Sequence, residues 1–156
     1  MRAKIYQWVG AMMVLCLLAC SSKPANLSGT WYLNTEKSRW GSARKPLSVA
    51  VTVAHEEPSL EYYGSVVYEN EESRPFSFKG AVDGKEYPIT RSFGPGRIVI
   101  HREGSNSWIS VCKSEDGRFA ETVRTTVSKR GQVLTRHMSL RGPQGSFLWT
   151  EVCEKR

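Results

Sequence analysis

The sequence predicts an all-β domain, an antiparallel up-and-down meander of about eight to ten strands that closes into a barrel. Beyond residue 28, short apolar runs alternate with polar residues and helical periodicity is nearly absent. Turn-forming pairs such as Asp116-Gly117 separate the runs, so neighbouring strands should pair antiparallel. Because so many short strands follow one another in one chain, the sheet is expected to curl and close on itself.

The candidate strands can be justified one by one from their alternation. They are residues 29–34, 47–54, 60–69, 74–80, 85–90, 96–103, 107–113, 118–128, 133–141 and 146–154. The second range places Val49, Val51 and Val53 on one face, as a half-buried strand requires. Pro88 makes the range 85–90 an edge strand or a bent strand, because proline donates no ladder hydrogen bond.

The first nineteen residues have the pattern of an export signal. Arg2 and Lys4 form a basic head, and residues 8–19 carry no charge. That apolar run is shorter than the ~20 residues that span a bilayer. We therefore expect a removable signal over residues 1–19, a polar tether over 20–28 and a barrel domain over 29–156.

The signal ends in Leu17-Leu18-Ala19-Cys20, which resembles the lipobox of bacterial lipoproteins. The resemblance implies that the Cys20 sulfur receives a diacylglyceryl group, that the chain is cut before it, and that its new amine is acylated, for example with palmitate. Several acyl chains anchor durably, because each buried methylene contributes about 0.8 kcal/mol. Ser21 is not the aspartate that retains such proteins at the inner membrane, which implies the outer membrane, facing the periplasm.

A second resemblance begins at Gly29-Thr30-Trp31. A Gly-x-Trp on the first strand of a meander resembles the lipocalin superfamily, and it implies that Trp31 closes one barrel end while Gly29 allows close backbone approach. The stretches LSGTWYLNTEKSRWG, VDGKEYPIT, TTVSKRGQVLT and EVCEKR are similar to a group of small exported bacterial proteins with a lipocalin-like fold and no settled function.

Composition limits the partners. The formal net charge is +7, but the basic residues are scattered, so we expect no nucleic-acid partner and an attraction to anionic lipids. Cys112 and Cys153 would reach an oxidising compartment, where a disulfide is predicted; two separate buried thiols are the alternative. No histidine stands at ligand spacing beside them, so no metal is expected.

The search for catalytic residues finds no motif. The only two aspartates, Asp83 and Asp116, precede glycines in predicted turns, and no nucleophile elbow or phosphate loop occurs. Four glutamates on the strands are expected to face solvent: Glu61, Glu69, Glu121 and Glu151. The three histidines are expected to have structural or surface roles. We therefore expect neither an enzyme nor a cofactor.

The remaining hypothesis concerns an apolar ligand in the barrel. The residues expected on one inward face are Tyr62, Val66, Tyr68, Phe76, Phe78, Ile98 and Ile100, with Trp108 or Ile109 beside them. Arg97 or Arg136 could pair with an acidic head group. The alternative is a filled barrel that docks an envelope partner, and a cavity of about 300 Å³ or more would favour the ligand. The sequence leaves the oligomeric state open.

Overall fold

The computed structural model describes residues 24–156. The predicted signal, the lipid-bearing Cys20 and the first part of the predicted tether lie outside these residues. The described chain forms ten strands: β1 (Gly29–Leu33), β2 (Ser48–Glu56), β3 (Ser59–Val67), β4 (Arg74–Ala81), β5 (Asp83–Arg91), β6 (Gly94–Arg102), β7 (Ser107–Ser114), β8 (Ala120–Val127), β9 (Val133–Gly142) and β10 (Gly145–Lys155). Among the described residues, no helix is long and apolar enough to cross a membrane.

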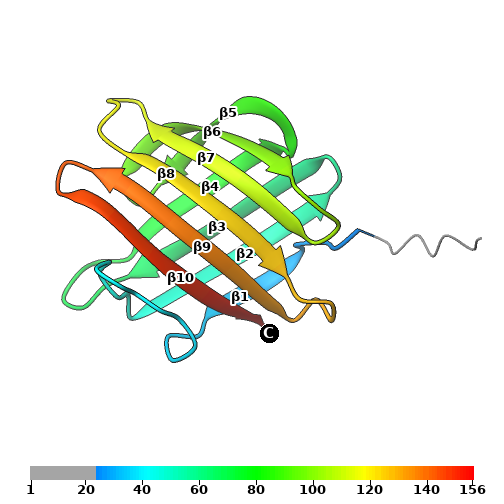
Figure 1. The fold of residues 1–156 in the computed structure, drawn as a ribbon, viewed down its shortest axis with the longest axis horizontal. Helices are drawn as coiled ribbons and strands as arrows, with labels where there is room; N and C mark the ends of the chain where they lie inside the picture. Colours follow the sequence, from blue (N-terminus) through cyan, green and yellow to red (C-terminus); the bar gives the residue numbers. More distant parts are fainter. Residues whose placement is uncertain (1–23) are drawn as a thin grey trace, which may run out of the picture.

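The ten strands form one closed antiparallel barrel (Figure 1). Each strand pairs with its sequence neighbours, and β1 pairs with β10 through Trp31↔Lys155, Tyr32↔Glu154 and Leu33↔Cys153. The predicted fold class is therefore confirmed, and each predicted range corresponds to one strand. The strand β5 is longer than expected at both ends, and its register against β6 shifts between Asp83 and Glu86.

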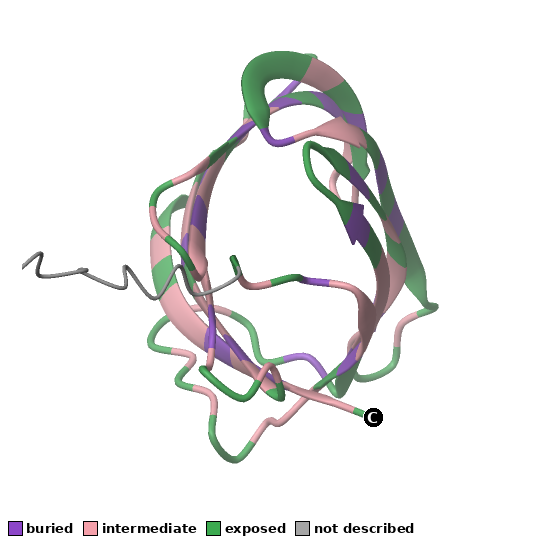
Figure 2. Ribbon diagram, turned by 90° about the vertical axis from the view of Figure 1, so that its right-hand side faces the viewer, coloured by how far each residue is buried: buried purple, intermediate pink, exposed green. Residues whose placement is uncertain are grey.

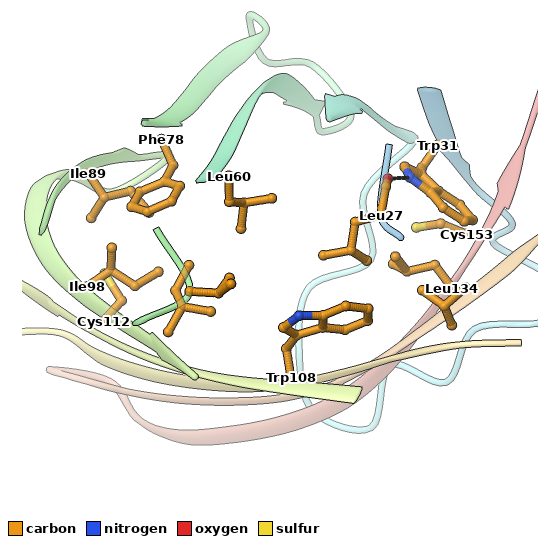
Figure 3. Close-up of a cluster of buried hydrophobic side chains, with 13 residues drawn as sticks. Leu27, Trp31, Leu60, Phe78, Ile89, Ile98, Trp108, Cys112, Leu134 and Cys153 are labelled. Atoms are coloured by element: carbon orange, nitrogen blue, oxygen red, sulfur yellow. Dashed lines mark hydrogen bonds between the residues drawn. The ribbon is translucent and has the colours of Figure 1, made fainter. Parts of the chain in front are cut away.

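Strand alternation builds the core. Because successive side chains point to opposite faces, alternate residues of every strand fill the barrel while their neighbours meet solvent. On β6, Gly96, Ile98 and Ile100 are buried, whereas Arg97 and His101 are exposed. Figure 3 shows the larger cluster of buried side chains, in which Phe78, Ile89 and Ile98 converge on one side of the interior.

The two barrel ends differ. At one end, here called the closed end, residues 25–28 cross the opening before β1 begins (Figure 2). The Ala25 N–H donates to the Ser105 carbonyl at 2.8 Å, and Leu27 is buried in the core. This part of the predicted tether is thus packed rather than free. The other end, here called the mouth, is surrounded by the long loop 34–47 and the loops after β3, β5, β7 and β9.

Candidate functional site: the barrel interior

Trp31 lies at the closed end of the barrel, next to Leu27. Its ring is fully buried, and its Nε1–H donates to the Leu27 carbonyl at 2.8 Å (Figure 3). The Lys155 ammonium lies 5.0 Å from the ring centroid. Gly29 has φ of +126°, and a Cβ there would come within 2.6 Å of the Lys155 side chain. Glycine at this position therefore allows the lysine to reach the tryptophan.

His55 fastens the segment before β1 to the wall. Its Nδ1 accepts the Leu27 N–H at 3.1 Å, so in the neutral ring the proton is on Nε2. The same residue's carbonyl accepts from Asn26 Nδ2 at 2.7 Å. The His55 Nε2 lies 3.5 Å from the Glu57 carboxylate, which also pairs with Arg102. Burial, outweighing the attraction of Glu57, lowers the pKa of His55 from its ordinary value.

The residues predicted to face inward lie inside the barrel. Tyr62, Phe76 and Ile100 line a chamber near the closed end, while Phe78 and Ile98 are buried in the adjoining core. Tyr68 lies nearer the mouth, beside Val66. Where the sequence left Trp108 or Ile109 open, the buried inward residue is Trp108.

The two arginines proposed for an acidic head group lie on opposite sides of the wall. Arg136 is on the inner face of β9, where its Nη1 donates to the Glu151 carboxylate at 3.0 Å. Arg97 points outward and pairs with the exposed Glu86, so it cannot meet a ligand inside the barrel. The reason is parity: because Ile98 and Ile100 face inward, their odd-numbered neighbour must face outward.

Two glutamates expected to face solvent are instead inside. Glu121 and Glu151 are buried, and each pairs with an interior arginine, Arg91 and Arg136 respectively. The strand pattern carried the signal, since Glu121 shares its parity with the buried Val123. The partners could not be found locally, because Arg91 is 30 residues from Glu121.

These four residues, Arg91, Glu121, Arg136 and Glu151, form what we call the charged layer. Trp149 joins it by donating its Nε1–H to Glu151 at 2.9 Å. Burial is the largest single influence on Arg91 and lowers its pKa, but the charge and hydrogen bond of Glu121, together with Tyr62 and Cys112, outweigh burial and raise the pKa, so the guanidinium stays charged. The layer is thus a neutral set of two cations and two anions inside a low-dielectric barrel.

Three hollows follow one another along the barrel axis. The inner chamber, about 100 Å³, lies between the closed end and the charged layer and touches Leu27, Trp108 and Arg91. A central cavity, also about 100 Å³, shares Phe76, Arg91 and Arg136 with it. The mouth pocket, about 500 Å³, shares Tyr68, Phe93, Trp149 and other residues with the central cavity. All four residues of the charged layer line the central cavity, so the layer lies between the inner chamber and the mouth.

The mouth pocket is lined by rings. Its aromatic residues are Trp40, Tyr68, Phe93, Phe119, Phe147 and Trp149. Phe93 stacks on Phe119 with ring centroids 5.0 Å apart, and the Arg44 guanidinium lies 4.6 Å from the Tyr68 centroid. Burial raises the pKa of Tyr68, so its hydroxyl remains neutral. This lining offers flat apolar surface with cationic groups at the rim.

The predicted disulfide between Cys112 and Cys153 does not form, and both thiols are free and buried. Cys112 lies on β7 and Cys153 on β10, with β8 and β9 between them. Three strand spacings of about 4.8 Å already exceed the ~7 Å that a disulfide allows between Cα atoms. Burial raises the pKa of each thiol to about 11, so both remain protonated.

The described residues contain no group of three or more His, Cys, Asp or Glu side chains placed to hold a metal ion. The three histidines lie apart: His55 at the closed end, and His101 and His137 on the outer faces of β6 and β9. What gathers inside the barrel is an aromatic and aliphatic wall with one neutral charged layer.

Fold and interior together define a lipocalin-like β-barrel with an open, aromatic mouth. A structure of zebrafish ileal bile acid-binding protein complexed with cholic acid is similar, with a TM-score of 0.55 at 15% identity over 83% of this chain and 98% of that one. Secretory abundant heat soluble protein 4 from Ramazzottius varieornatus is similar with a TM-score of 0.53 at 14% identity, over 86% of this chain and 96% of that one. The sequence matches no protein-family model and no curated protein. At these identities the likeness concerns the fold.

Proposed function

We propose that this protein binds a small apolar or amphipathic molecule through the mouth of its barrel. The observation that carries the proposal is the mouth pocket, whose volume of about 500 Å³ lies in the usual range of ligand sites. Aromatic rings supply large apolar contact area with little loss of side-chain freedom. The similarity to a barrel crystallised with cholic acid supports the same class of ligand.

The alternative is an interaction protein whose barrel is filled. Its support is the size of the inner chamber and central cavity, each about 100 Å³ and below the ~300 Å³ expected of a ligand site. The two functions differ in the part of the barrel that makes contact with the bound molecule. A ligand binder uses the mouth rings, whereas an interaction protein would bind a partner through its outer wall.

Binding is tested with the unlipidated chain, residues 20–156 carrying Cys20→Ser. Native mass spectrometry of the purified chain detects a co-purifying molecule, and titration with apolar compounds follows thermal unfolding. Ligand at 100 times its dissociation constant should add about 2.7 kcal/mol of stability. No shift with any apolar compound at its solubility limit would favour the filled barrel.

A matched pair of tyrosines on β3 and its extension locates the site. Tyr68 lines the mouth pocket, whereas Tyr63 points outward and is 64% exposed. Tyr68→Ala should weaken ligand binding about tenfold, because an aromatic wall of the pocket is lost. Tyr63→Ala should leave the affinity unchanged. Equal effects of the two substitutions would place binding outside the mouth.

The proposal includes an anchor, in which Cys20 carries lipid and holds the protein at the outer membrane, facing the periplasm. Four residue steps link Cys20 to Pro24 and reach at most about 14 Å. Since the chain from Pro24 enters the barrel at the closed end, that end would lie near the lipid and the mouth would face away. Metabolic labelling with a fatty acid tests the anchor, and equal label on wild type and Cys20→Ser would refute it.

A further inference from the structure

The inner chamber contains two buried hydrogen-bond donors that have no acceptor. Trp108 is only 2% exposed, and its Nε1 has no partner among residues 24–156. The Nε of Arg91, whose side chain is 11% exposed, likewise has none. Both side chains line the chamber. A buried donor without an acceptor is costly, so two of them around one hollow indicate a place for an acceptor atom.

The other polar groups of the chamber do not supply that acceptor. The hydroxyls of Ser110, Thr125 and Tyr62 line the same hollow but accept no hydrogen bond from Trp108 or from the Arg91 Nε. Each hydroxyl can both donate and accept, so together they can surround a hydroxyl or carbonyl oxygen from outside the protein. The remaining lining is apolar, including Leu27, Leu60 and Ile100.

The paired charges of the charged layer favour an uncharged acceptor. Arg91 and Arg136 are each already paired with a glutamate inside the barrel. A carboxylate brought into the chamber would be a third anion against two cations, and an uncompensated buried charge is far more costly than an uncharged oxygen. An alcohol or carbonyl oxygen can accept a hydrogen bond from a free donor of the chamber and leaves the balance of the layer unchanged.

We propose that the inner chamber binds an uncharged oxygen, an alcohol or a carbonyl, at one end of an otherwise apolar ligand whose body extends past the charged layer into the mouth pocket. This inference rests on the proposed function and specifies its ligand class. It replaces the acidic head group expected from the sequence, because the interior arginine proposed for that role, Arg136, is already neutralised by Glu151.

The test compares dodecanol with dodecanoate, which share a chain and differ in the charge of the oxygen-bearing end. Isothermal titration of the unlipidated chain at neutral pH should give dodecanol an affinity at least about tenfold higher. Equal or tighter binding of dodecanoate would overturn the inference while leaving the proposed function intact. Binding of neither compound would count against both, and Tyr68→Ala would then show whether other apolar ligands use the mouth.

Two substitutions test separately the contribution of the free N–H donor and that of the charge balance to ligand preference. Trp108→Phe keeps the ring and removes the N–H, so dodecanol should bind about tenfold more weakly while dodecanoate is unaffected. Glu121→Gln keeps the shape of the side chain and leaves Arg91 uncompensated, so the preference should shift toward dodecanoate. An unchanged dodecanol affinity in Trp108→Phe, or an unchanged preference in Glu121→Gln when thermal unfolding confirms a folded protein, would contradict the inference.

Discussion

Replacing Leu27 with alanine tests whether the segment before β1 is part of the folded barrel. Leu27 is 7% exposed, its N–H is bonded to His55, and its carbonyl receives the Trp31 indole. Truncation to alanine loses about 2 kcal/mol of transfer free energy, and the void left beside the inner chamber adds about 1–2 kcal/mol. We therefore expect the free energy of unfolding to fall by about 3 kcal/mol.

The measurement is urea unfolding of the unlipidated chain, followed by circular dichroism. Leu148→Ala is the matched control, because Leu148 is 68% exposed on the outer face of β10 and should change stability by less than about 0.5 kcal/mol. If the two alanine variants unfold at the same urea concentration, residues 25–28 behave as a tether and the closed end is not sealed by Leu27.

Three further outcomes are expected. Because the folded pKa of His55 is lowered, the unfolded state takes up a proton first as the pH falls. Stability should therefore decrease below about pH 6.5, by at most about 1.4 kcal/mol per pH unit, and His55→Gln should remove this contribution to the slope in urea titrations. Gly64→Ala should destabilise by about 2–3 kcal/mol, measured by thermal unfolding, since its Cβ would lie 2.3 Å from a backbone oxygen of β2. In the unlipidated chain, Cys112 and Cys153 should react slowly with a thiol reagent while the protein is folded, and two thiols per chain should react once it is unfolded. If no thiol reacts after unfolding, the two cysteines form a disulfide after all.

The strands were predictable because their signal is local. Alternation and turn residues lie within each run, so ten ranges and their antiparallel order follow from short windows of sequence. Parity then fixes the inward set once one member is known to be buried, as it does for Ile98 and Ile100. The same rule assigns Arg97 to the outside and Glu121 to the inside, which corrects both expectations.

What could not be predicted depends on contacts distant in sequence. Burial of Glu151 is tolerable because Arg136 of the adjacent strand neutralises it, and no short window contains both. Residues 25–28 have the composition of a linker, and contacts distant in sequence, among them those with His55 and Ser105, make them part of the fold. The separation of the two cysteines likewise depends on β8 and β9 lying between their strands.

The seam between β1 and β10 has a consequence for how this chain is made. The first strand of the ring can find its second neighbour only when the last residues, up to Lys155, are present. Holding ends more than a hundred residues apart costs about 4 kcal/mol of chain entropy, which this short seam must overcome. Until β10 pairs with β1, the sheet has two unpaired edges to which another chain can bind. The pairing of β10 with β1 is therefore the step that protects the molecule from aggregation.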